Sequence, residues 1–70
     1  MEKREIIQEL ITETEKIILV LEDNLRKYNL HAVMLDVYDK YIIRVQDDIS
    51  EEISKYKERL KWLKQELDKL

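Results

Sequence analysis

Residues that could bind a metal ion or transfer a proton are few in this chain. His31 is the only histidine, and the sequence contains no cysteine. A metal site on helices needs a second imidazole or thiolate, or a carboxylate at a spacing such as Glu-x-x-His, and His31 has none of these. We therefore expect His31 to lie in a turn or at a helix cap.

Four aspartates near the middle of the chain are the other chemical candidates, namely Asp36, Asp39, Asp47 and Asp48. Carboxylates bind cations, but an EF-hand loop also needs alternating ligands and a glycine at its turn. Catalytic carboxylates need a pocket that shifts their pKa, and no sequence feature indicates one. We predict that these aspartates lie on a solvated helix surface. We expect no catalytic residue, no cofactor and no metal, so the protein should not be an enzyme.

Basic and aromatic side chains alternate between residues 55 and 64. Trp62 lies between Leu60 and Leu63 but outside the main hydrophobic row, so we expect it to be exposed, as tryptophans at protein interfaces often are before binding. The basic residues of the segment are Lys55, Lys57, Arg59, Lys61 and Lys64. Together with Trp62 they form a candidate contact site for another protein. Nucleic acid is the alternative partner, although the formal net charge of -3 disfavours it.

The composition predicts that helices position these residues. The 70 residues include no glycine and no proline, the residues on which tight turns and hairpins depend. Charged residues make up 41% and hydrophobic residues 44% of the chain, a mixture typical of long amphipathic helices. We expect one all-α domain, 1–70. The longest apolar run is far shorter than a membrane span and no signal-peptide pattern is present, so we expect a cytoplasmic protein.

Hydrophobic spacing predicts two helices of unequal length. The first covers about 2–28, with apolar residues on one side at Ile7, Leu10, Ile11, Ile17, Ile18, Leu21, Leu25 and Tyr28, interrupted by Thr14. Asn29 favours a helix end, which predicts a turn at 28–31. The second helix covers about 31–69. Its row resembles a coiled-coil seam and consists of Leu35, Tyr38, Ile42, Val45, Ile49, Ile53, Tyr56, Leu60, Leu63, Leu67 and Leu70.

An alternative break lies in the second helix at 47–50. Asp48 and Glu51 have the spacing of a helix cap and its partner, and acidic residues follow in the first turn. A turn at this point would give a monomeric three-helix bundle. The hydrophobic row nevertheless continues through 47–50 at helical spacing, which favours one long helix.

A turn near Leu30 would leave the end of the chain without a neighbour. Met1 would lie opposite Arg59, and residues 60–70 with their four leucines would project past the first helix. An antiparallel second copy, related by a two-fold axis near Ile53, could cover this projection and would place the acidic residues 47–52 against the basic residues 55–64. The sequence thus predicts a homodimeric four-helix bundle.

This architecture indicates a function in binding rather than catalysis. We expect a small homodimeric adaptor or regulator that binds another protein through the outer helix surfaces or the region around Trp62. The alternatives are a nucleic-acid-associated regulator that uses 55–64 of each subunit, and one subunit of a larger helical assembly.

Overall fold

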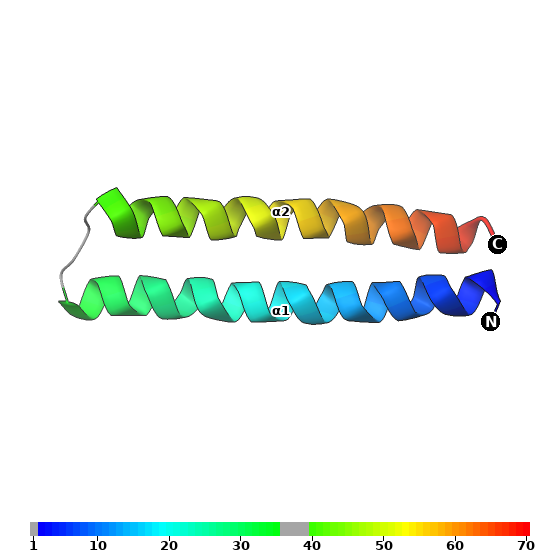
Figure 1. Cartoon of the computed structure of the whole chain (residues 1–70), viewed down its shortest axis with the longest axis horizontal. Helices are drawn as coiled ribbons and strands as arrows, with labels where there is room; N and C mark the ends of the chain where they lie inside the picture. The colour runs from blue at the N-terminus through cyan, green and yellow to red at the C-terminus, as the bar shows by residue number, and fades with distance from the viewer. Residues whose placement is uncertain (1, 36–39) are drawn as a thin grey trace.

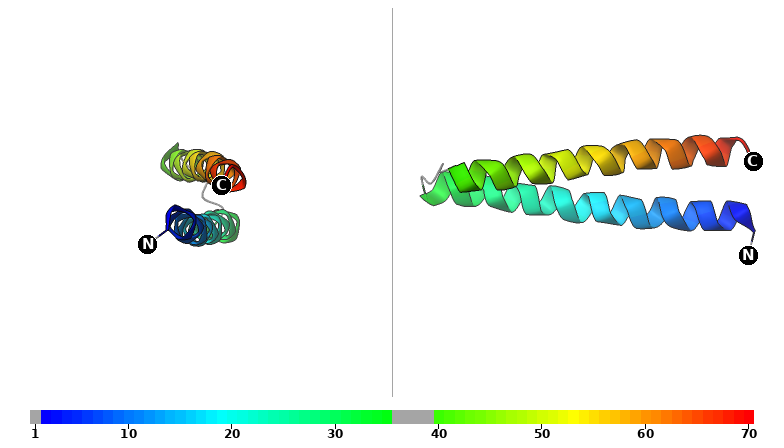
Figure 2. Two further views of the ribbon diagram at one scale, coloured as in Figure 1. Left: turned by 90° about the vertical axis from the view of Figure 1, so that its right-hand side faces the viewer. Right: turned by 45° about the horizontal axis from the view of Figure 1, so that its top comes forward.

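The chain folds into two antiparallel helices that pack side by side as a hairpin. The structure is a computed structural model that describes the backbone of residues 2–35 and 40–70 and the side chains of 2–30 and 43–70. Helix α1 comprises Lys3–Leu35 (33 residues), and α2 comprises Lys40–Asp68 (29 residues). Figure 1 shows the two helices running along each other with both termini at the same end. The views in Figure 2 agree. The hairpin measures 51 × 14 × 14 Å.

The predicted turn at 28–31 is wrong, because α1 continues through these residues to Leu35. Asparagine costs a helix interior no more than about 0.7 kcal/mol relative to alanine, so Asn29 alone cannot stop the helix. Its side chain instead joins the helices, because the Gln46 Nε2–H donates a hydrogen bond to the Asn29 Oδ1. His31 therefore lies within α1 and not in a turn or at a cap.

Moving the reversal of the chain to a point between Leu35 and Lys40 removes the predicted overhang. When the turn of a hairpin moves by one residue toward the C-terminus, each residue of the first helix faces a residue two positions further along the second helix. The helices consequently end together, and Leu60–Leu70 does not project beyond α1 (Figure 1). Leu63 is buried at 4% exposure, and Leu60 and Leu67 are half-buried against α1.

Helix α2 is continuous through 47–50, so the predicted alternative break is absent. A local ion pair fits this geometry, because the Lys55 Nζ lies 3.6 Å from the Glu51 Oε1 one helical turn away. The described parts of the chain therefore contain two helices, and the all-α hairpin is the fold.

The core is a single seam between two hydrophobic rows. The inward row of α1 consists of Ile7, Ile11, Thr14, Ile18, Leu21 and Leu25, and that of α2 consists of Val45, Ile49, Ile53, Tyr56, Leu60, Leu63 and Leu67. Steps of three and four residues keep each row on one side of its helix, as in a coiled coil. Four further residues belong to the predicted row of the second helix. Leu35 lies at the end of α1, and Leu70 is exposed. Tyr38 and the side chain of Ile42 lie outside the described residues.

Thr14 is the one polar member of the inward row of α1. Its side chain is only 6% exposed. The hydroxyl donates a hydrogen bond of 2.7 Å to the Leu10 carbonyl oxygen one turn earlier. This bond satisfies the buried donor, and so threonine can occupy the seam without an uncompensated polar group.

The seam predicts very different costs for truncating two adjacent residues. Ile18 is 6% exposed and Leu19 is 67% exposed. We expect Ile18→Ala to lower the free energy of unfolding by about 2–5 kcal/mol, because it leaves a cavity in the core. Leu19→Ala should change it by less than about 0.5 kcal/mol. Urea denaturation followed by circular dichroism measures both values, and equal losses would contradict the packing described here.

Candidate interaction surface

The hairpin leaves an unusually large part of its surface in water. Its accessible area is 5818 Å², whereas a compact monomer of 8.6 kDa exposes about 4,700 Å². The radius of gyration is 16.0 Å, against about 11 Å for a compact 70-residue domain. None of the described side chains is completely buried. The accessible surface is thus larger than that of a compact monomer of this mass, and part of it is available for contacts with other chains.

Much of the exposed hydrophobic surface lies in a second row on α1. We call this the flank row, and it consists of Ile6, Leu10, Ile17, Val20 and Tyr28. Their exposed fractions range from 39% for Ile17 to 60% for Val20. Helical spacing places the flank row about a quarter of a turn from the inward row. Ile17 and Val20 also line a shallow, almost entirely apolar depression with Leu21.

Three residues of the flank row differ from the inward row in burial, although the hydrophobic spacing predicts all of them on one side of the first helix. Leu10, Ile17 and Tyr28 are 48%, 39% and 41% exposed. Each of them lies next to the inward row on the surface of α1. The part of that surface that α2 covers is too narrow to include both rows. The sequence feature that distinguishes the two rows is the occurrence of adjacent hydrophobic residues. One residue of each pair belongs to the flank row and the other to the inward row, as in Ile6-Ile7, Leu10-Ile11 and Ile17-Ile18.

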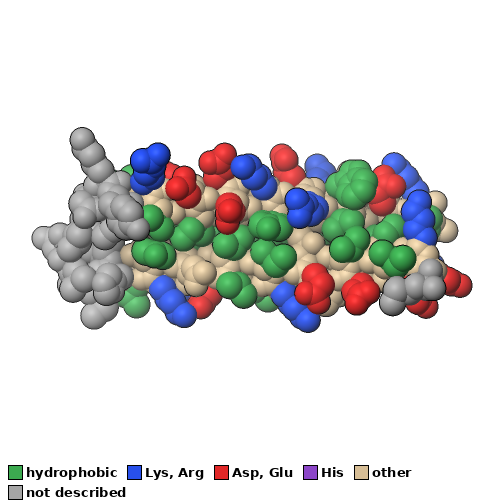
Figure 3. All heavy atoms as spheres, in the orientation of Figure 1, with side chains coloured by type: hydrophobic (Ala, Val, Ile, Leu, Met, Phe, Trp, Pro, Cys, Tyr) green, Lys and Arg blue, Asp and Glu red, His purple; other side chains and the backbone are tan. Residues whose placement is uncertain are grey.

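The two broad faces of the hairpin differ in character. On the face opposite the flank row, Glu22, Arg26 and Asn29 of α1 line a depression together with Ser50 and Lys57 of α2. That depression is open, and Leu25 and Ile53 of the core line its floor between these polar and charged side chains. Figure 3 shows one face of the molecule, where hydrophobic side chains form a strip along the line between the helices and charged side chains lie at both outer edges.

On the side of α2 next to the flank row the side chains are charged. Steps of four, three and four residues place Asp48, Glu52, Lys55 and Arg59 in one strip. Adjoining surface depressions contain these same side chains. The Arg59 guanidinium also lies 5.2 Å from the centre of the Tyr56 ring, a cation–π contact that holds it against the helix. Between residues 48 and 59 the strip is therefore acidic first and basic after, and the same spacing continues it to Trp62 and Glu66.

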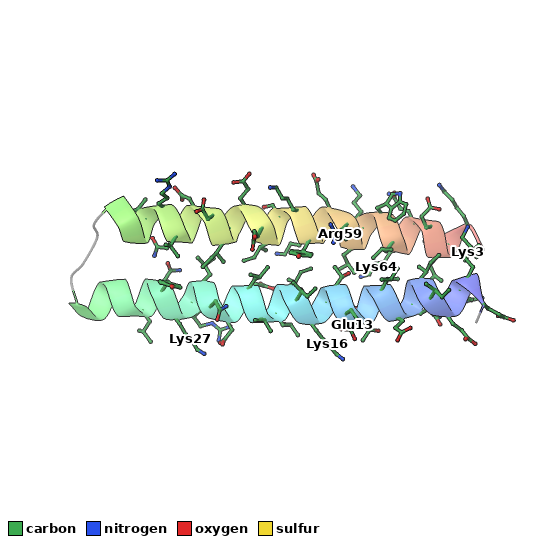
Figure 4. The ribbon with its side chains drawn as sticks, viewed as in Figure 1. Lys3, Glu13, Lys16, Lys27, Arg59 and Lys64 are labelled. Atoms are coloured by element: carbon green, nitrogen blue, oxygen red, sulfur yellow. The ribbon has the colours of Figure 1, made fainter. Side chains whose placement is uncertain are left out.

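The predicted contact site at 55–64 is divided between two sides of α2. Trp62 is 57% exposed, as expected from its position outside the hydrophobic row. Lys55 and Arg59 precede it by seven and three residues and share its side of the helix. The other three basic residues, at the same four-and-three spacing, form a separate row of Lys57, Lys61 and Lys64. Figure 4 labels Arg59 and Lys64 on α2. The basic residues thus do not form one continuous patch.

Charged side chains also border the flank row along its outer edge. Glu9 and Glu13 lie in the first half of α1, and Lys16 and Lys27 follow toward its end. Figure 4 shows Lys16 and Lys27 on the side of α1 that points away from α2. Their partners in the monomer are local, since Lys16 pairs with Glu13 at 3.6 Å and Lys27 pairs with Asp23 at 3.1 Å.

Other kinds of site find no support among the described residues. The described part of the chain holds no cluster of three or more potential metal ligands, and Asp36 and Asp39 lie outside it. Within the same part, neither helix combines the length and the apolar character that crossing a bilayer requires. No protein-family model, curated protein sequence or solved structure matches the chain.

Proposed function

We propose that this protein is a homodimeric helical-bundle adaptor or regulator that acts by binding other proteins and catalyses no reaction. The observation that carries the proposal is the excess of exposed surface. It amounts to about 1,100 Å² per chain over a compact monomer of this mass, and each partner in a standard protein interface buries about 800 Å². A single dimer contact would thus bring the chain to the burial of an ordinary small domain.

The distribution of that surface supports binding over catalysis. The depressions on the described surface are shallow and open, whereas small-molecule sites are concave and enclose most of the ligand. Extended helix surfaces suit partners that are themselves macromolecules. Trp62, with Lys55 and Arg59 in the same row, supplies an exposed aromatic side chain and two donors of the kind that dominate protein interfaces.

Self-association is tested by the mass in solution. Sedimentation equilibrium over a concentration series should give a mass of twice the 8.6 kDa chain at the higher concentrations. The physical reason is that an isolated pair of helices leaves too much hydrophobic surface in water. A mass that remains at that of one chain throughout the series would contradict the proposed homodimer.

Nucleic acid is the competing partner, and the basic segment 55–64 with its exposed tryptophan is the observation in its favour. The division of the basic residues between two sides of α2 weakens this alternative. We expect no saturable binding of labelled duplex DNA or single-stranded RNA in fluorescence anisotropy at physiological salt. Binding that weakens steeply with salt, and that Lys57→Gln with Lys61→Gln reduces, would replace the protein adaptor by the nucleic-acid regulator.

A further inference from the structure

We infer that the flank row of α1 is the dimer seam, and that the same row of a second, antiparallel copy of this chain covers it. The inference rests on the proposed homodimer and names its contact surface. It replaces the leucine overhang on which the sequence-based dimer depended, because those leucines already pack against α1.

The position of the flank row fits the corner of a four-helix bundle. Each helix in such a bundle packs against two neighbours, in directions about a quarter of a turn apart. Helix α1 has two hydrophobic rows at this separation, one against α2 and one exposed. Helix α2 has one hydrophobic row, and the strip beside it is charged apart from Trp62. Helix α1 is therefore the helix that can lie against its own counterpart.

The order of charges selects the antiparallel arrangement. Parallel copies would place Glu9 beside Glu9 and Lys27 beside Lys27 along the edge of the flank row. An antiparallel copy instead brings Glu9 of each chain near Lys27 of the other. On α2, the same operation brings Glu52 of each chain near Arg59 of the other. Glu9 with Lys27 on α1, and Glu52 with Arg59 on α2, are thus pairs of opposite charge across the antiparallel contact.

The hydrophobic residues are also matched in this direction. A two-fold axis that crosses α1 midway between Leu10 and Tyr28 places Leu10 of each copy against Tyr28 of the other. The same axis passes beside Val20 and places Ile17 against Leu21, a half-buried residue of the inward row that borders the flank row. The residues opposite each other between Leu10 and Tyr28 are then large and apolar, and Ile6 lies beyond Tyr28 of the other copy.

A matched pair of substitutions tests the seam. Leu10 and Leu19 lie on the same helix and are both exposed in the hairpin, but only Leu10 belongs to the flank row. We expect Leu10→Glu to raise the dimer dissociation constant at least about a hundredfold, because two leucines per dimer lose their burial and two carboxylates replace them. Leu19→Glu adds the same charge and should change it less than about threefold, as expected of a surface site. Sedimentation equilibrium gives both constants, and circular dichroism verifies that both variants stay helical.

Single cysteines test the orientation, since the natural chain has none. Val20→Cys lies beside the proposed two-fold axis and should form a disulfide-linked dimer in mild oxidant. Leu19→Cys is its control on the other side of α1. Ile6→Cys should also stay monomeric in denaturing gels, because antiparallel copies hold these residues roughly 39 Å apart, far beyond the reach of a disulfide.

The outcomes separate the inference from the function it rests on. A wild-type chain that remains monomeric overturns both. A wild-type dimer that Leu10→Glu leaves intact overturns the seam but not the homodimer. Cross-linking through Ile6→Cys, with none through Val20→Cys, overturns the antiparallel arrangement. Dissociation by Leu10→Glu alone, together with cross-linking through Val20→Cys alone, supports the inference.

Discussion

Each helix of the hairpin has only one neighbour, and this limits how much hydrophobic surface the fold can bury. One neighbour covers one side of a helix, so α1 can place Ile7, Ile18 and the rest of its inward row in the core. The flank row lies too far round the helix to reach α2. The exposed leucines and isoleucines of α1 are thus a consequence of the two-helix architecture, and only another molecule could cover them further.

Charge reinforces the direction in which the helices pack. Acidic residues predominate in the first half of α1 and in the first half of α2, whereas the second half of α2 is rich in lysine and arginine. Antiparallel packing brings Glu13 and Glu15 of α1 alongside the lysine-rich segment 57–64 of α2. The ion pairs between described side chains are all local, three or four residues apart. The order of charges therefore favours antiparallel helices through long-range attraction between oppositely charged segments. The specific contacts between the helices come from the hydrophobic seam.

Hydrophobic spacing predicted the helical hairpin and the continuity of α2, because periodicity over many turns averages out local ambiguity. It failed at the turn, since a chain without glycine or proline carries no strong local stop signal and Asn29 is a weak one. An error of several residues there became a false overhang of eleven residues. The flank row was missed for a related reason. Leu10 and Ile17 lie only one residue from inward positions, and periodicity alone does not show how wide a strip one neighbour covers.

In the proposed dimer, the two faces of the hairpin would serve different kinds of contact, one for self-association and the other for other partners. If the flank row packs against a second copy, the polar face with Glu22, Arg26 and Lys57 points away from that contact and remains in water. The row of Lys57, Lys61 and Lys64 lies on this same face. Trp62 lies on the other side of α2, at the edge of the face that carries the flank row. A partner protein would then meet a surface of fixed charge presented twice by a rigid bundle. In the proposed dimer, self-association would thus add to the stability of the fold and would leave recognition of a partner to the exposed polar side chains.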